Sequence, residues 1–438
     1  MAETSAIYRP RHPERTPFYQ LFDRYFDRYL GEYEERFEPR YGYLRPVVAR
    51  TVSAFLECGR LQNGFARIRC PKCRGEHLLA FSCQTRNFCP SCQAKRAALV
   101  AERWLVGILA PVPHRHLIFT IPKVLRGLFQ RERRLLSILT RSAYDAVRTT
   151  WATGFEDRRA LPGMVISIQT FGSFANWHPH LHALVTNGVM MRDGQFLELP
   201  QWTPQVVEEL FRRLVLKRLV AAERLSEEFQ QTLLGWVHSG FAVHGERVVW
   251  RDDSASLERL ARYALRAPVP FDAVELHGAK VRVKTPPDPR TGERDLLLDP
   301  IDWIHAVTLQ VPDPRRHLVR YYGAYANRSR KLWQGRASGL GWGAARAESG
   351  PPAAEPASPP NGPPGSRTGS WARLLRRILE VDPLLCPRCG VEMKIVAVIT
   401  APKVVDAILW SLSRGACRDP FAERAPPTPA VGGAATIQ

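Results

Sequence analysis

Three alternating histidines near the middle of the chain place the strongest constraint on its fold. In the run Asn176-Trp177-His178-Pro179-His180-Leu181-His182-Ala183-Leu184-Val185, imidazoles alternate with apolar side chains. Side chains of a β-strand point alternately to opposite faces, so His178, His180 and His182 share one face and the residues between them face a core. Alternate strand positions lie about 6–7 Å apart, which lets imidazoles converge on one divalent ion. The run therefore predicts a half-buried strand that carries a metal site.

A further metal ligand is offered by the segment before this strand. Met164 to Thr170 has the apolar and β-branched content of a second strand, joined to the histidine strand by a short loop. Gln169 on that strand is predicted to supply an oxygen ligand or to hold a histidine in place, the alternative being an ordinary polar strand residue. The histidine motif alone names no reaction, because a zinc hydrolase can use such a strand too.

Two close cysteine pairs lie in the N-terminal quarter of the chain. Cys70 and Cys73 form one Cys-x-x-Cys pair and Cys89 and Cys92 another, with fifteen residues between the pairs. This is the spacing of a four-thiolate zinc site, and such a site without an open ligand position is structural. Possible substitutes, or members of a second site, are Cys58, Cys83 and His77. A cytidine-deaminase site is excluded because no His-x-Glu precedes the cysteines.

A third pair, Cys386 and Cys389, lies near the C-terminus in Cys386-Pro387-Arg388-Cys389-Gly390. It is a possible second zinc half-site whose partner ligands are not evident from the sequence. Cys417 is one candidate partner.

The charge of the chain points to a polyanionic partner. Its 438 residues include 62 Lys and Arg against 42 Asp and Glu, a formal net charge of +20, which favours nucleic acid. Aromatic residues near basic ones favour single strands, because bases stack on aromatic rings. There is no secretory signal and no apolar run of the roughly 20 residues that cross a bilayer. We therefore expect a cytoplasmic, nucleoid-associated protein without a membrane partner, whose nine cysteines are metal ligands or free thiols.

Tyr263 is the predicted nucleophile. In the helical segment from Ser254 to Arg266, the apolar residues fall on one face and Tyr263 on the opposite, polar face. Arg259 and Arg266 are its neighbours on that helix, and their guanidinium groups suit the oxygens of a phosphodiester. A tyrosine packed at a helix edge is the alternative. Tyr321 and Tyr325, four residues apart, are rival nucleophiles, although Gly323 between them weakens a helix.

These features together resemble the rolling-circle transposases of the insertion-sequence ninety-one type, in the His-hydrophobe-His (HUH) endonuclease superfamily. The resemblance covers nearly the whole chain and rests on several motifs as they stand in the sequence. They are Leu56-Glu57-Cys58-Gly59-Arg60-Leu61, Phe88-Cys89-Pro90-Ser91-Cys92, Gln169-Thr170-Phe171-Gly172-Ser173, the histidine strand, Arg262-Tyr263 with Arg266-Ala267-Pro268, His317-Leu318-Val319-Arg320-Tyr321-Tyr322-Gly323 and Cys386-Pro387-Arg388-Cys389-Gly390.

The resemblance implies an α+β fold with a five-stranded antiparallel sheet of the HUH type and helices on one side. It also implies that His180 and His182 bind Mg²⁺ or Mn²⁺, with His178 or Gln169 as a third ligand, and that Tyr263 forms a 5′-phosphotyrosine with single-stranded transposon ends. Members with two tyrosines carry the other one four residues earlier, where this chain has Arg259. The chain thus resembles the single-tyrosine branch, and a homodimer, reuse of Tyr263 or a later tyrosine would serve the second DNA end.

The pattern of helices, strands and loops predicts the domain organisation. We expect helices over Phe18–Arg60, Lys123–Phe155, Thr203–Trp236 and Ser254–Arg266, a strand at His116–Ile121 and a hairpin over Phe241–Trp250. The predicted domains are a helical, zinc-binding domain (1–110), an HUH nuclease domain (111–336), a disordered linker (337–370), a small Cys-x-x-Cys segment (371–417) and a disordered tail (418–438). Two other functions stay open: a non-catalytic, zinc-dependent DNA-binding regulator and a metallonuclease that uses water in place of tyrosine.

Overall fold

The computed structural model describes residues 6–7, 12–153, 155, 160–172, 175–199, 202–245, 248–250, 253–270, 273–285, 292, 295–342, 381–382 and 384–413. The chain divides into two compact units. The cysteine unit comprises Met1–Pro13, Glu57–Cys83 and Gly365–Gln438, and the sheet unit comprises Glu14–Leu56 and Gln84–Pro364. The predicted tail and most of the predicted linker, like Cys417, lie outside the described residues.

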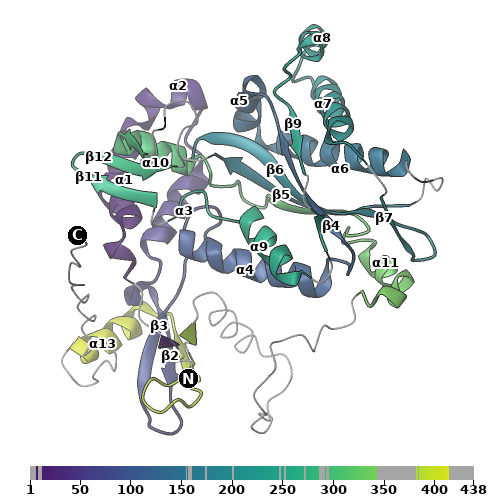
Figure 1. Ribbon diagram of the computed structural model, residues 1–438. Coiled ribbons are helices and arrows are strands. Elements are labelled where there is room, and N and C mark those ends of the chain that lie inside the picture. Colours follow the sequence, from purple (N-terminus) through teal and green to yellow (C-terminus); the bar gives the residue numbers. More distant parts are fainter. Residues whose placement is uncertain are drawn as a thin grey trace, which may run out of the picture. The chain divides into compact units, whose positions relative to one another are not determined.

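The sheet unit is built around one antiparallel sheet with the strand order β10-β4-β6-β5-β14 (Figure 1). Its strands are β4 (His114–Thr120), β5 (Gly163–Phe171), β6 (Trp177–Thr186), β9 (Ala242–His244), β10 (Val248–Val249) and β14 (Val319–Gly323). β9 and β10 each pair with β4, at opposite ends of the same edge, so the sheet is five strands wide. The hairpin predicted over Phe241–Trp250 is therefore wrong. Its two halves add to a third strand instead of pairing with each other.

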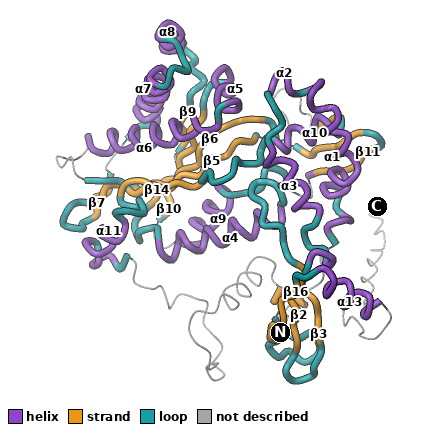
Figure 2. Tube along the Cα trace, turned by 180° about the vertical axis from the view of Figure 1, so that it is seen from behind, coloured by secondary structure: helices purple, strands orange, loops and turns teal. Residues whose placement is uncertain are grey.

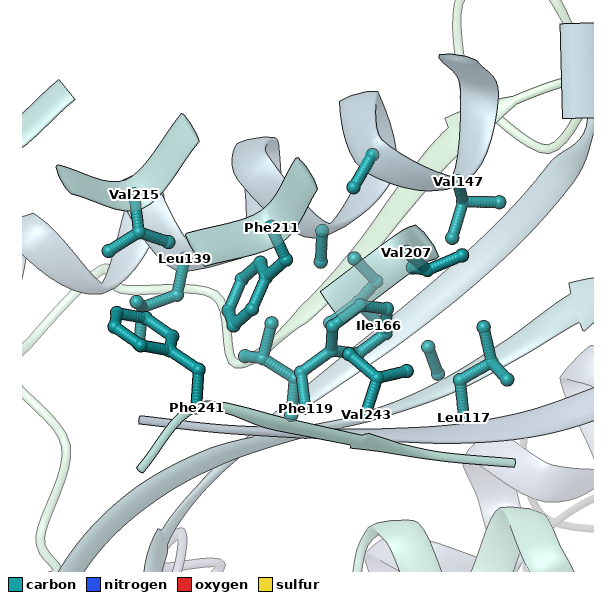
Figure 3. Packing of buried hydrophobic residues seen from close by; sticks show 14 of the residues in the cluster. Leu117, Phe119, Leu139, Val147, Ile166, Val207, Phe211, Val215, Phe241 and Val243 are labelled. Atoms are coloured by element: carbon teal, nitrogen blue, oxygen red, sulfur yellow. The ribbon is translucent and has the colours of Figure 1, made fainter. Parts of the chain in front are cut away.

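One face of the sheet carries the largest apolar core. Leu117 and Phe119 of β4, Ile166 of β5, and Leu181 and Ala183 of β6 point to this face. They pack against α5 (Lys123–Arg131), α6 (Leu136–Thr153) and α7 (Pro204–Ala221), as Figure 3 shows for Phe211 and its neighbours. Burial of these side chains follows the period of two along each strand, which is why the alternation could be predicted from the sequence.

The opposite face of the sheet is covered by α4 (Pro90–Gly107) and α9 (Ser254–Ala264). Trp104 and Ala101 of α4 and Leu257 and Ala261 of α9 share a core with sheet residues of this face, among them Leu184. Helices thus lie on both faces, and the implied arrangement with helices on one side only is wrong. The α+β fold class with an antiparallel sheet is confirmed.

The rest of the sheet unit forms a second group of helices and strands (Figure 2). It contains α1 (Pro17–Arg36), α2 (Glu38–Tyr41), α3 (Pro46–Leu56), α10 (Pro300–Thr308) and the antiparallel β11 (Val274–His277), β12 (Lys280–Lys284) and β13 (Asp295–Leu298). Phe18 of α1 packs edge to face against Trp303 of α10, and Phe22 packs against the same ring at 53°. The remaining elements are η3 (Arg133–Leu135), β7 (Gly188–Met190), β8 (Phe196–Glu198), α8 (Glu227–Gly235), α11 (Arg330–Arg336) and η5 (Ser338–Leu340).

The cysteine unit has a three-stranded antiparallel sheet of the order β16-β2-β3. β2 (Phe65–Arg69) and β3 (Glu76–Ala80) form a hairpin, and β16 (Lys394–Ile399) pairs with β2 although more than 300 residues separate them in sequence. Further elements are β1 (Ala6–Ile7), β15 (Val381–Asp382), η2 (Leu61–Asn63) and α13 (Pro402–Ser413). No helix in the described ranges is long and apolar enough to cross a membrane.

Candidate active site and metal ligands

The three histidines of β6 form a row on the face of the sheet that α4 and α9 cover. The ring centroids of His178 and His180 are 5.2 Å apart, and those of His180 and His182 are 5.0 Å apart. His180 and His182 are buried, while His178 is half-buried. The structure thus places all three on one face, as their spacing predicts, because β6 keeps a regular pleat through them.

Two ring nitrogens of this row face each other. His180 Nδ1 lies 2.8 Å from the carbonyl oxygen of His178, so this nitrogen carries a proton that it donates, and Nε2 keeps its lone pair. That Nε2 lies 3.2 Å from Nε2 of His182. Two nitrogens that bind one ion at about 2.1 Å each are about 3 Å apart, so the pair has the spacing of two metal ligands. Among the described residues no third His, Cys, Asp or Glu completes a ligand group with this pair.

The histidines of the row are neutral at physiological pH. Burial, with the neighbouring His180 and His116, lowers the pKa of His182 to about 2. Burial, with the charge of Arg126, lowers the pKa of His178 to about 4. The pKa of His180 is also lowered, mainly by burial. Neutral imidazole is the form that binds metals.

Gln169 on β5 lies opposite His180 and connects the strand to α9. Its Nε2 donates to the carbonyl oxygens of Tyr263 and Ala264, at 3.0 Å each. Ser167, opposite His182, donates to the Ala264 carbonyl at 2.7 Å. These carbonyls lie in the last turn of α9, where that of Tyr263 also accepts from the Arg266 N–H at 3.2 Å. The two side chains thus fix the end of α9 over the histidine row. Gln169 Oε1 is buried and has no hydrogen-bond partner among the described residues, which leaves an oxygen available as a ligand.

Tyr263 lies beside His182. The two ring centroids are 5.3 Å apart and the rings are perpendicular. Tyr263 is 44% exposed, so its phenol is accessible. The guanidinium of Arg266 lies over the Tyr263 ring, 4.7 Å from its centroid, whereas Arg259 donates to Ser256 Oγ on its own helix. The structure therefore brings Arg266 to the tyrosine and engages Arg259 elsewhere.

The rival tyrosines occupy different surroundings. Tyr325 is fully buried, its hydroxyl is 2.6 Å from His114 Nε2, and burial raises its pKa far above the usual range. The hydroxyl of Tyr321 accepts a hydrogen bond of 3.1 Å from the indole of Trp104. Both pack against the apolar core beneath α4, which disfavours contact with DNA.

His116 on β4 is a site residue that the sequence analysis did not identify. Its Nε2 lies 3.0 Å from Nδ1 of His182, and the two rings are nearly parallel, at 12°. When His182 uses Nε2 as a ligand, its Nδ1 carries the proton and donates a hydrogen bond to His116 Nε2. A signal was present, because His116 alternates with Leu117 and Phe119 on a predicted strand.

Four cysteines of the cysteine unit form a tetrad. The sulfur atoms of Cys70, Cys73, Cys386 and Cys389 all lie within 4.8 Å of one another. Cys70 faces Cys389 and Cys73 faces Cys386, each pair with sulfurs 3.5 Å apart. The backbone N–H groups of Cys73 and Lys72 lower the pKa of Cys70, which favours the thiolate that binds metals.

Two comparisons with known proteins bear on this arrangement. A family model described as "Putative transposase" matches residues 163–332, which include β5, β6 and α9. A second, described as "Transposase zinc-binding domain", matches residues 25–121.

The "Transposase for insertion sequence element IS801" of Pseudomonas savastanoi pv. phaseolicola is 26% identical over 380 residues, 82% of this chain and 86% of that protein. The chain belongs to the transposases of the insertion-sequence ninety-one (IS91) type. A protein of Sinorhizobium fredii named "Putative transposase y4qJ" is 26% identical over 316 residues, 64% of this chain and 75% of that protein. No solved structure matches the transposase.

The cysteine tetrad corrects one expectation for this transposase. The sequence predicted that Cys70 and Cys73 share a metal with Cys89 and Cys92, the nearest pair along the chain. The structure instead gives them Cys386 and Cys389, because β16 pairs with β2 and brings the C-terminal pair to the hairpin. The predicted half-site of Cys386 and Cys389 therefore has its partners in Cys70 and Cys73.

The other cysteines of the transposase lie outside this tetrad. Cys89 and Cys92 are buried at the start of α4 in the sheet unit. In the cysteine unit the backbone N–H of Cys83 donates to Cys58 Sγ at 3.3 Å. His77 is buried on β3.

Proposed function

We propose that this transposase cleaves single-stranded DNA by attack of Tyr263 on a phosphodiester and rejoins it by the reverse step. The observation that carries the proposal is the contact of the Tyr263 and His182 rings, 5.3 Å apart. It puts an accessible phenol beside two converging lone pairs. A DNA-binding regulator needs neither a nucleophile nor a buried row of neutral histidines.

The residues present suit a divalent ion. His180 and His182 would hold it through Nε2. Gln169 Oε1 would be the third ligand, and His178 is the alternative for that position. A buried amide oxygen without a partner costs free energy unless something satisfies it, which supports Gln169 as a ligand. When bound, Mg²⁺ or Mn²⁺ polarises the scissile phosphate.

The reaction is a transesterification, in which the tyrosine oxygen replaces the 3′ oxygen on phosphorus. The Tyr263 hydroxyl loses its proton and its oxygen bonds to phosphorus, while the bond from phosphorus to the 3′ oxygen breaks and that oxygen takes up a proton. The product is a 5′-phosphotyrosine with a free 3′-hydroxyl. A 3′-hydroxyl that attacks the phosphotyrosine reverses the step, so no ATP is consumed. The exposed Arg266 guanidinium, held over the tyrosine ring, would bind a phosphate oxygen of the scissile bond.

The tetrad of Cys70, Cys73, Cys386 and Cys389 is proposed to hold a structural zinc ion. Its four sulfurs and two tight knuckles match the ligands that structural zinc uses. Around the first knuckle, Lys72 and Arg74 are exposed, while Arg67 and Arg69 are paired with Glu76. Among the described residues no carboxylate pairs with Lys72 or Arg74, so both are available to a DNA phosphate. Cys89 and Cys92 of the sheet unit remain candidates for ligands of a second zinc ion.

A labelled-oligonucleotide assay tests the proposal. The substrate is single-stranded DNA from the region flanking the gene, labelled at either the 5′ or the 3′ end and incubated with Mg²⁺ or Mn²⁺. We expect a covalent adduct that retains only the 3′ label, and none with Tyr263→Phe, while Tyr321→Phe behaves as wild type. Two free fragments from the wild-type protein would favour a hydrolase that uses water, and no cleavage would favour a regulator.

A further inference from the structure

Arg126 on α5 is held by a hydrogen bond beside the His178 end of the histidine row, the end away from Tyr263. α5 follows closely after β4, whose last residue, Thr120, pairs with His180. The indole N–H of Trp177 donates to the carbonyl oxygen of Arg126 at 2.9 Å. Because Trp177 directly precedes His178, this bond holds the backbone of Arg126 beside the start of the row.

The side chain of Arg126 acts on that same end. After burial, its positive charge is the largest cause of the lowered pKa of His178, and at His180 it contributes less than Arg266 does. It does not contribute at His182, where the guanidinium contribution comes from Arg266. The row is therefore flanked by Arg126 near His178 and by Arg266 with Tyr263 near His182.

Among the described residues, Arg126, like Arg320, lacks the partners that several other half-buried arginines of this unit have. Its Nε is buried and has no hydrogen-bond partner among the described residues. Burial lowers the pKa of its guanidinium, and no carboxylate raises it. By contrast, Arg133 donates to the carbonyl oxygens of Leu309 and Val311, and Arg218 pairs with Asp145. A desolvated cation without an acid is unfavourable alone and binds an anion well.

The in-line geometry of phosphoryl transfer indicates which part of the DNA would lie near Arg126. In a phosphoryl transfer the attacking and leaving oxygens lie on opposite sides of phosphorus. Tyr263 attacks from the His182 end, so the 3′ oxygen departs towards the His178 end. We propose that Arg126 binds the first phosphate of the departing strand, on the 5′ side of the cleaved bond, and holds the 3′-hydroxyl for rejoining. This inference rests on the proposed function.

Neutralising single phosphates tests it. Oligonucleotides from the DNA flanking the gene would carry a methylphosphonate at the linkage just 5′ or just 3′ of the cleaved bond, as mapped with the wild-type protein. The variants are Arg126→Gln, which keeps length and polarity without charge, and Arg126→Lys, which restores the charge. Arg131→Ala removes an exposed charge from the same helix and is the matched control. Thermal unfolding of each variant confirms that it is folded.

We expect Arg126→Gln to slow rejoining roughly 10- to 100-fold, the range for a lost hydrogen bond to a charged group. The 5′ methylphosphonate should slow the wild-type protein by a similar factor and leave Arg126→Gln unaffected. The 3′ methylphosphonate should slow both proteins alike. Arg126→Lys should recover part of the rate, and Arg131→Ala should match the wild type.

Two results would overturn the inference while leaving the proposed function intact. One is rejoining by Arg126→Gln at the wild-type rate, and the other is an equal response of both proteins to the 5′ methylphosphonate. No adduct from the wild-type protein on any unmodified substrate would instead overturn the proposed function, and this inference with it.

Discussion

The histidine row and the cysteine tetrad are both metal-ligand sets, but the chain assembles them in opposite ways. His178, His180 and His182 lie within five residues of one strand, whereas Cys70 and Cys389 meet across 319 residues of sequence. The first set is arranged by the pleat of a single strand, and the second exists only because β16 pairs with β2. Local geometry thus fixes the first set, and tertiary pairing fixes the second.

The two sets also differ in what holds them without a metal. The histidines lie within a sheet whose two faces are covered by apolar cores. The core around the tetrad is small, and all four of its cysteines belong to it or border it. A small core contributes little stability, so the cysteine unit should depend on its metal far more than the sheet unit does.

The largest expected effect is therefore loss of zinc from the tetrad. Cys386→Ser and Cys70→Ser should each remove the same ion and unfold the cysteine unit, since structural zinc contributes about 10 kcal/mol or more. Elemental analysis of the two single variants and the double variant measures this, and the double should lose no more zinc than either single. Cys89→Ser is the discriminating arm. If Cys89→Ser removes the same ion as Cys70→Ser, then Cys70 and Cys73 share their metal with Cys89 and Cys92, as the sequence predicted.

The next largest effect concerns the histidine row. His180→Ala should slow cleavage about a thousandfold, because a lost Lewis acid costs several kcal/mol of transition-state stabilisation. Single-strand binding and zinc content should stay close to wild type, measured by filter binding and elemental analysis. His178→Ala should cost much less if Gln169 is the third ligand. Equal losses for the two variants would make His178 the ligand instead.

A smaller effect is expected at His116, which touches a ligand and not the metal. His116→Leu should weaken Mn²⁺ binding by about 10- to 100-fold, the usual cost of removing a partner of a metal-bound histidine. His116→Gln keeps an acceptor for His182 Nδ1 and should retain most of the affinity. Titration followed by Mn²⁺ paramagnetic resonance measures both. If the two variants are equally weak, His116 acts through packing and not through the proton that it accepts.

The smallest expected effect is on the pH dependence of the stability of the sheet unit, through buried histidines that are not metal ligands. Burial lowers the pKa of His305 to about 3 and of His114 to about 4. Unfolded histidines bind protons as the pH falls through about 6.5, whereas these stay neutral, so acid favours the unfolded state. Each should lower the free energy of unfolding by about 1.4 kcal/mol between pH 7.5 and 5.5.

Chemical denaturation at the two pH values, with His305→Gln as the comparison, measures this loss. The variant should show a smaller drop than the wild type. An equal drop would mean that His305 is already protonated or accessible in the folded protein.

How far the sequence could predict the molecule follows from the same distinction. The strand at His178, the helix of Tyr263 and the helical segments before and after them depend on periodicity, which is local. The partners of Cys386, the placement of β9 and β10 on one edge of β4, and helices on both faces depend on pairings between distant segments, which no local pattern encodes. His116 stayed hidden because it acts through His182 on another strand, and Arg126 because its position depends on a hydrogen bond from Trp177 on another element.

The central claim is that Tyr263 becomes linked to DNA beside the histidine row. The most direct measurement is mass spectrometry of protease and nuclease digests after incubation with single-stranded DNA and Mn²⁺. The account predicts a nucleotide phosphate on the peptide that contains Tyr263, which is lost with Tyr263→Phe and with His180→Ala. A modified peptide that contains Tyr321 or Tyr325 instead, or an adduct formed normally by Tyr263→Phe, would contradict it.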